Sequence, residues 1–248
     1  MSAIYILWLR QLKRYFRSKS RIAGSLGQPL LFLVALGFGF GPIYQKAGGG
    51  NYIEFLAPGI IAMSVLFSAV FSGIEIIWDR QFGFLKETLV APVSRFKIMI
   101  GRTLGGATTA SFQGVVVFLM TLAVGFRPHG ILSLLLAIAF MFLIAVLFTA
   151  LGTAIASRME DFSGFQLISN FLVMPLFFLS GALFPLKGLS PTISLIAAID
   201  PLSYGVDGLR DALTGAGVYG VGMNLTILGA ISVLLFAIGG YLFSKIEI

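Results

Sequence analysis

The chain has 248 residues, of which 58% are hydrophobic and 11% are charged. Soluble domains carry about 25% charged residues, so this composition excludes an ordinary soluble domain and indicates an integral membrane protein. With no cysteine and one histidine, disulfides and thiolate metal sites are excluded, and no metal site is expected. The net charge of +7 is better explained by basic residues on the cytoplasmic side of a membrane protein than by nucleic-acid binding.

Residues 1–21 are predicted to form an amphipathic helix. On a helical wheel, apolar side chains that include Ile4, Trp8 and Leu12 share one arc. The opposite arc carries the basic residues Arg10, Lys13, Arg14 and Arg17. Such a pattern is typical of a helix that lies in the membrane interface. Its basic face is either a topology anchor or a docking surface for a cytoplasmic partner.

Six apolar runs follow, each long enough to cross about 30 Å of hydrocarbon as a helix. They are expected at residues 22–41, 55–77, 103–125, 131–156, 162–184 and 221–243. With the N-terminus inside, thirteen Lys and Arg residues fall on the inner side and four on the outer side. The positive-inside rule therefore places both termini in the cytoplasm. The predicted fold is an all-α membrane domain of six spans over residues 22–248.

A charged segment at residues 78–102 separates the second and third spans. It contains five basic and two acidic residues, and each ionised side chain costs about 2.5–3.5 kcal/mol at mid-bilayer. We therefore expect a cytoplasmic segment, longer than the two to eight residues that join helices in bundles. Because proline disfavours a helical residue before it, a short helix should end at Pro92, and a second helix should begin at Pro92 or Ser94.

The run WDRQFGFLKETLVAPVSRFKIMIGR in this segment resembles the cytoplasmic segment of ATP-binding-cassette (ABC) exporter permeases of the type-two class. That class includes drug-resistance and nodulation-factor exporter permeases, which this chain resembles most. Two further stretches fit the same family: YIEFLAPGIIAMS at residues 52–64, and FLSGALFPLKGLSP with IDPLSYGVDGLRDAL within residues 178–213.

This resemblance implies that the charged segment docks on a separate ATPase and transmits its closure. The residues that match the docking segment are Trp78, Asp79, Arg80, Phe84, Lys86 and Glu87, with Pro92 as a hinge. The sequence has no G-x-x-x-x-G-K-[ST] motif, so ATP and Mg²⁺ are expected on a P-loop ATPase subunit, with no cofactor and no enzymatic activity in this chain. The expected assembly is a permease homodimer with two ATPases in a prokaryotic plasma membrane. It would move an amphipathic, lipid-linked or drug-like substrate outward.

Few polar residues lie inside the expected spans. Glu75 lies about one turn from the inner surface and is expected to be a paired or snorkelling carboxylate rather than a proton relay. Gln166, Ser169 and Asn170 share one face of the fifth span. They either line a translocation path or make contacts between helices or subunits. Glycines at residues 37–41 and 101–106 are expected to allow close packing.

Residues 185–220 are too polar to span and too long for a turn. One short helix is expected to begin at Pro191 and a second at Pro201, each after a capping residue. The second has an apolar stripe, and Asp207 and Arg210 are spaced to pair on its polar face. By resemblance to the family, these are extracellular re-entrant helices.

Three other functions were weighed. A secondary transporter driven by an ion gradient predicts charges near mid-span or interrupted helices in matched halves, and neither stands out. A membrane-embedded enzyme requires convergent His, Asp or Glu residues at one depth, whereas the acids fall in loops. A membrane assembly protein remains an alternative.

Overall fold

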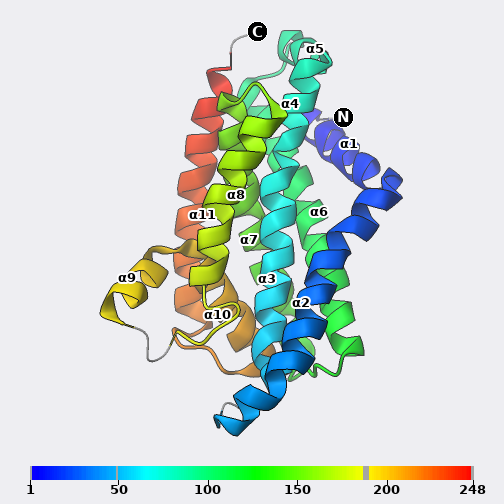
Figure 1. Cartoon of the computed structure of the whole chain (residues 1–248). Coiled ribbons are helices and arrows are strands. Elements are labelled where there is room, and N and C mark those ends of the chain that lie inside the picture. The colour runs from blue at the N-terminus through cyan, green and yellow to red at the C-terminus, as the bar shows by residue number, and fades with distance from the viewer. Residues whose placement is uncertain (1, 49, 187–189, 247–248) are drawn as a thin grey trace.

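The computed structural model describes residues 2–48, 50–186 and 190–246, which form eleven α-helices and no β-strand (Figure 1). Six helical segments are long and apolar enough to cross a membrane, so the prediction of an all-α protein with six spans is confirmed. The helices are α1 (Ala3–Arg17), α2 (Lys19–Lys46), α3 (Tyr52–Ser72), α4 (Ile74–Gln81), α5 (Phe84–Val90), α6 (Arg95–Ala123), α7 (Ile131–Arg158), α8 (Phe162–Leu179), α9 (Pro191–Ile199), α10 (Pro201–Thr214) and α11 (Val221–Ser244).

Helix α3 is the centre of the bundle and packs against α2, α6, α7 and α10 (Figure 1). Most of its side chains are buried, whereas α2, α8 and α11 bury few of theirs. The exposed side chains include Leu31, Phe38 and Phe171. Apolar side chains turned outward on three outer helices suit a hydrocarbon environment.

The second span is broken at Gly73, where the backbones of two helices meet. A Cβ added to Gly73 would lie under 3.0 Å from the carbonyl oxygen of Gly152 on α7. A Cβ added to Gly152 would also lie under 3.0 Å from the carbonyl oxygen of Val70 on α3. Only glycine allows this approach. Beyond the break, α4 continues to Gln81. The sequence predicted that a loop segment begins at Trp78, whereas in the structure Trp78 belongs to the end of the second span.

Three other helix ends differ from or refine the predictions. Helix α2 passes the expected end at residue 41 and includes both Pro29 and Pro42. Helix α8 ends at Leu179, before the predicted end at residue 184, because Gly181 adopts a left-handed conformation with φ +75°. Of the two possible starts for α6, Ser94 is the capping residue.

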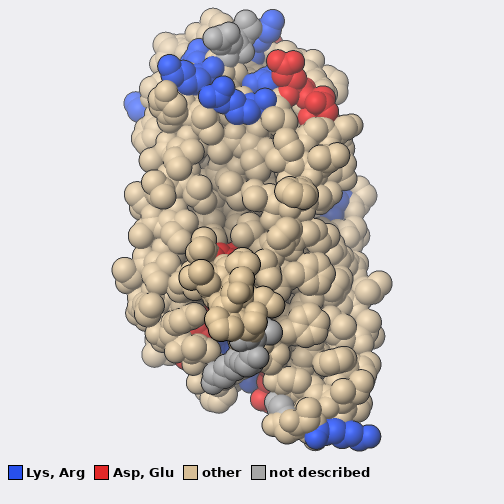
Figure 2. All heavy atoms as spheres, turned by 60° about the vertical axis from the view of Figure 1, so that its left-hand side comes forward, with Lys and Arg blue, Asp and Glu red and all other residues tan. Residues whose placement is uncertain are grey.

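Two ends of the bundle differ in composition. One end carries α1, α5 and the last turn of α11, and is called the α5 end below; the other carries α9 and α10 and is called the α10 end (Figure 1). Figure 2 shows that most visible Lys and Arg side chains gather at the α5 end. This asymmetry is the one on which the predicted orientation rests.

At the α10 end, both short helices begin where the sequence predicted, at Pro191 and Pro201. The apolar stripe of α10 is fully buried, and it comprises Leu202, Val206, Leu209 and Leu213. The predicted pair between Asp207 and Arg210 is wrong. Asp207 accepts from the backbone N–H groups of Val218 and Tyr219, and Arg210 donates to backbone carbonyls. Each side chain satisfies nearby loop groups, which no helical spacing rule predicts.

The junction between α9 and α10 contains a buried carboxyl group. Asp200 caps α10, since its Oδ1 accepts from the N–H of Leu202 at 2.8 Å, but its Oδ2 has no hydrogen-bond partner among the described residues. Burial raises the pKa of Asp200 from 3.8 to about 7, and the bond from Leu202 opposes this increase.

We predict a pH-dependent contribution of Asp200 to stability. Because its pKa is higher in the folded state, its contribution is fully present below about pH 4 and is lost as the pH rises through about 7. The loss is about 1.4 kcal/mol per pH unit within this window. An Asp200→Asn variant keeps a capping side chain but cannot ionise. The melting temperature of the wild type should therefore fall more than that of Asp200→Asn between pH 5 and pH 7; parallel pH profiles would contradict this prediction.

Candidate coupling site at the α5 end

Helix α5 is a short outward-facing helix at one end of the bundle (Figure 1). Gly83, with φ +77°, reverses the chain before it, and Leu85 anchors it in a small buried cluster. Lys86 and Glu87 are exposed, as is Phe84. Helix α5 therefore presents one aromatic ring and two opposite charges on its outer surface.

Arg10 of α1 connects α5 to the second span. Its guanidinium carbon lies 3.8 Å from the centre of the Phe84 ring, a cation–π distance. Its Nη2 donates to Oδ1 of Asp79 on α4 at 2.8 Å. One side chain from the first helix thus contacts both the outward-facing helix and a buried carboxylate.

Asp79 belongs to a set of ion pairs, partly buried, that we call the ion cluster. Its members are Arg10, Arg14, Arg21, Glu75, Asp79 and Arg102. Oδ2 of Asp79 accepts from Nη2 of Arg102 on α6, and Arg14 approaches Oδ1 of Asp79 at 3.5 Å. Glu75 pairs with Arg21 at 2.9 Å and with Arg14 at 3.7 Å.

The ion cluster holds four arginines against two carboxylates; the carboxylates and Arg102 are buried, and the other three arginines are 31–35% exposed. The side chain of Asp79 is 6% exposed and that of Arg102 is 3% exposed. Burying such charges is costly unless they are paired, and removing one partner leaves the other uncompensated. The cluster therefore fixes the relative positions of α1, α4 and α6.

Helix α1 packs on α6 through its apolar arc. A Cβ on Gly101 or Gly105 of α6 would collide with α1, which confirms that these glycines allow close packing. Trp8 Nε1 donates to Thr108 Oγ1 at 3.1 Å, and Tyr15 donates to Gln113 at 2.6 Å. The apolar arc therefore packs against α6 through Trp8 and Tyr15, while Tyr5 and Phe16 on the same arc stay exposed.

The N-terminal basic face divides into two pairs. Lys13 and Arg17 are exposed, as predicted, whereas Arg10 and Arg14 point into the ion cluster. All four residues line one open hollow, but Arg10 and Arg14 are also paired within the chain, which the sequence did not predict. Two buried carboxylates on the adjacent α4 attract the two arginines that lie nearest to them.

The predicted docking residues occupy three kinds of position. Asp79 lies in the ion cluster, and Arg80 donates to the carbonyl oxygen of Met159 at 2.7 Å. The side chains of these two residues are engaged inside the chain, which corrects the expectation that they face a partner. Trp78 is partly exposed and stacks on Phe162, and Pro92 is exposed in the turn between α5 and α6. The outward-facing group is thus Phe84, Lys86 and Glu87.

The polar residues of the fifth span lie apart from the ion cluster. On α8, Ser169 is fully buried, Asn170 is partly buried and Gln166 is exposed. The hydroxyl of Ser169 has no hydrogen-bond partner among the described residues. Whether these residues line a translocation path or make a contact between helices or subunits is not tested, so both roles stay predictions. Of the other glycines singled out, Gly39 and Gly41 face open space within this chain.

Sequence reasoning missed Arg21 and Arg102 as ion-pair partners. It predicted a paired Glu75 correctly but looked for the partner among its sequence neighbours. The available signal was charge balance: two acids at the end of an apolar helix require cations, and the N-terminal segment supplies an excess of them.

Comparison with known proteins identifies the family to which the chain belongs. A model of the family described as "ABC-2 type transporter" matches residues 2–214. The chain belongs to the ABC-2 type transporter family. The resemblance noted in the sequence is thereby confirmed, and the protein is a membrane permease of this family.

Several nodulation proteins are similar to this ABC-2 permease along most of its length. Nodulation protein J of Rhizobium leguminosarum bv. viciae is 28% identical over 209 residues, covering 84% of this chain and 80% of the relative. Nodulation protein J of Rhizobium leguminosarum bv. trifolii is 29% identical over 213 residues, covering 85% and 78%. That of Rhizobium meliloti (strain 1021) is 26% identical over 236 residues, covering 92% and 89%.

Proposed function

We propose that this permease is the membrane subunit of an ATP-driven exporter. A separate P-loop ATPase docks at the α5 end, in the cytoplasm, and two permease copies assemble with two ATPases. The substrate is amphipathic, lipid-linked or drug-like, and it moves outward across a prokaryotic plasma membrane. Family membership and the Lys and Arg asymmetry support this proposal.

One observation carries the coupling part of the proposal. The outward-facing helix α5 contacts Arg10, and Arg10 pairs with Asp79, which also pairs with Arg102. A displacement of α5 by a docked ATPase would disturb the contact between Phe84 and Arg10. Through Arg10, it would act on α1, α4 and α6 together, because the ion cluster joins these helices.

An ion-gradient mechanism receives less support. Such a mechanism needs a carboxylate in the membrane that can bind and release a proton or a cation. Glu75 and Asp79 are the buried carboxylates in the described spans, and both pair with arginines. Held in this way, they are poorly suited to exchange an ion during each transport cycle.

The docking proposal predicts that a Phe84→Ala/Glu87→Arg double variant loses its ATPase. The tagged permease would be purified from native membranes in mild detergent, and co-purifying P-loop ATPase would be quantified. We expect the wild type to retain the ATPase and the double variant to lose most of it, because the variant removes the ring and reverses the charge on the exposed surface of α5.

A control is Glu160→Arg/Phe178→Ala, which makes the same two kinds of change elsewhere on the chain, away from the Trp78 ring. Glu160 is exposed, and Phe178 is 50% exposed. Retention of the ATPase by the control and its loss from the α5 variant would support docking on α5. Equal retention by both variants, or equal loss, would contradict it.

A further inference from the structure

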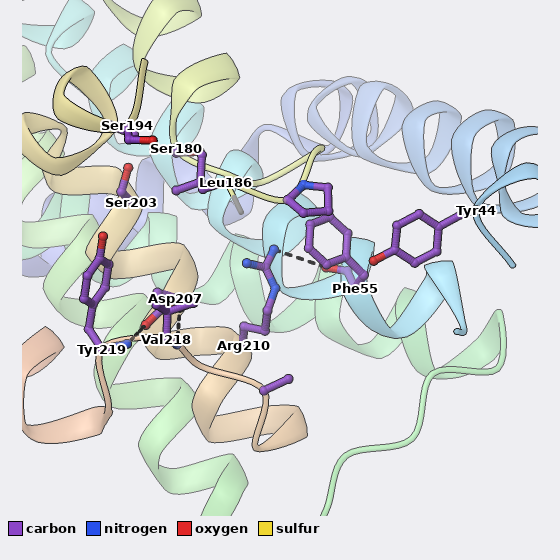
Figure 3. A pocket seen from close by; sticks show the side chains of 13 residues that line it. Tyr44, Phe55, Ser180, Leu186, Ser194, Ser203, Asp207, Arg210, Val218 and Tyr219 are labelled. Atoms are coloured by element: carbon purple, nitrogen blue, oxygen red, sulfur yellow. Dashed lines mark hydrogen bonds between the residues drawn. The ribbon is translucent and has the colours of Figure 1, made fainter. Parts of the chain in front are cut away.

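A half-open pocket lies at the α10 end of the bundle, opposite the end that holds the ion cluster (Figure 3). Its volume is about 330 Å³, at the lower end of the range for small-ligand sites. Residues from α2, α3, α9 and α10 line it, together with the segments at 180–186 and 216–219. The aromatic rings of Tyr44, Phe55 and Tyr219 contribute to the wall.

Arg210 supplies a cation to this pocket. Its Nη2 donates to the carbonyl oxygens of Gly181 at 2.9 Å and of Phe55 at 3.4 Å. The guanidinium carbon lies 4.1 Å from the centre of the Phe55 ring. Burial lowers the pKa of Arg210 to about 10, with Asp207 opposing the decrease, so the side chain remains charged at neutral pH.

The other nitrogens of Arg210 have hydrogen-bonding capacity left. Nε is buried without a partner, and Nη1 donates to no residue in the described part of the chain. A guanidinium has five N–H donors and pairs best with carboxylates and phosphates. Leaving a buried donor unpaired costs about 1–3 kcal/mol, or more when it is charged.

Asp207 lines the same pocket but does not pair with Arg210. Its two oxygens accept from the backbone N–H groups of Val218 and Tyr219 and from the side chain of Asn224. Its acceptor capacity is therefore used within α10, α11 and the loop between them. The buried hydroxyl of Ser203, which also lines the pocket, has no partner among the described residues. The unused hydrogen-bonding capacity of this pocket thus comprises N–H donors of Arg210 and one hydroxyl that can donate or accept.

We propose that the pocket binds an anionic group, a carboxylate or a phosphate, attached to a small apolar or aromatic body. The anion pairs with the free edge of Arg210, the hydroxyl of Ser203 donates to it, and the aromatic wall holds the body. The anion comes either from a soluble molecule or from the head group of a membrane lipid. This site does not depend on ATPase docking, and its test uses no ATP.

The test uses a single cysteine as a reporter, since the chain contains none of its own. Ser194 lines the pocket and is exposed, whereas Thr192, on the same helix, is exposed but does not line it. Ser194→Cys and Thr192→Cys would each be placed in phosphatidylcholine nanodiscs and labelled with a maleimide. Phenyl phosphate is the probe, and benzyl alcohol is the neutral comparison.

We expect phenyl phosphate to slow labelling of Ser194→Cys several-fold and benzyl alcohol to leave it unchanged. Labelling of Thr192→Cys should not respond to either compound. If phosphatidylglycerol nanodiscs slow labelling of Ser194→Cys without added probe, the anion is a lipid head group. If phenyl phosphate alone slows it, the anion is a soluble molecule.

Two further changes test the chemistry in the Ser194→Cys background. Arg210→Gln removes the cation, and Ala216→Phe fills the pocket from an exposed loop position without altering the carbonyl bonds of Arg210. Both should abolish protection; if Arg210→Gln does not fold, Ala216→Phe decides. The proposal is overturned if neither anion slows labelling, if Ala216→Phe keeps full protection, or if Thr192→Cys is protected equally.

Discussion

Replacing Asp79 by alanine is expected to lower the free energy of unfolding by about 3–5 kcal/mol, the usual cost of breaking a buried ion pair. The substitution leaves the guanidinium of Arg102, which is 3% exposed, without its carboxylate partner. It also releases Arg10, and with it the contact that joins α1 to α4. The loss would be measured by unfolding the purified permease in mixed micelles with increasing SDS.

A double variant separates charge compensation from simple loss of packing. In Asp79→Leu/Arg102→Met, both buried charges are absent, so the stability should recover most of the loss, because apolar replacements of a buried pair are often neutral. Glu87→Ala serves as the surface control and should change stability by less than about 0.5 kcal/mol. If Asp79→Ala unfolds at the same SDS fraction as the wild type, the ion cluster does not hold α1, α4 and α6 together.

Replacing Gly152 by alanine is expected to destabilise the bundle by about 1–3 kcal/mol, the range for an overpacked core. The new methyl group would lie under 3.0 Å from the backbone carbonyl of Val70. Backbone atoms cannot rotate away as a flexible side chain can, so α7 and the central helix α3 must separate. Expression in the membrane and the midpoint of thermal unfolding should both fall.

The matched control is Gly27→Ala on α2. A Cβ at Gly27 meets no atom within 4 Å, and alanine favours a helix over glycine by about 1 kcal/mol. This variant should be neutral or slightly more stable. If Gly27→Ala and Gly152→Ala behave alike, the close approach of α3 and α7 is not what makes Gly152 necessary.

Much of the fold could be predicted because the membrane imposes simple rules. The six spans follow from apolar length, and Ser94, Pro191 and Pro201 mark helix starts by local chemistry that needs no tertiary information. The break at Gly73 could not be predicted in this way, because it depends on α7 approaching from a distant part of the sequence. Helix α8 ended early through the conformation of one residue, Gly181.

The candidate site was predicted less completely than the fold. The exposed group on α5 could be recognised by its resemblance to a family, but the resemblance does not say which charged residues face inward. Asp79 lies one helical turn beyond Glu75, and both require cations that come from α1, α2 and α6. Pairing across 69 residues, as between Arg10 and Asp79, is decided by packing rather than by spacing.

The docking of α1 has a consequence for the order of membrane insertion. Helix α1 is made before α4 and α6, and its partners Asp79 and Thr108 lie 69 and 100 residues later in the chain than Arg10 and Trp8. During synthesis its arginines are therefore unpaired, and free positive charges hold a nascent segment on the inner side of the membrane. Once α4 and α6 have inserted, two of those charges, Arg10 and Arg14, are paired with buried carboxylates. The same arginines thus guide topology early in biogenesis and complete the tertiary structure only after the third span is in place.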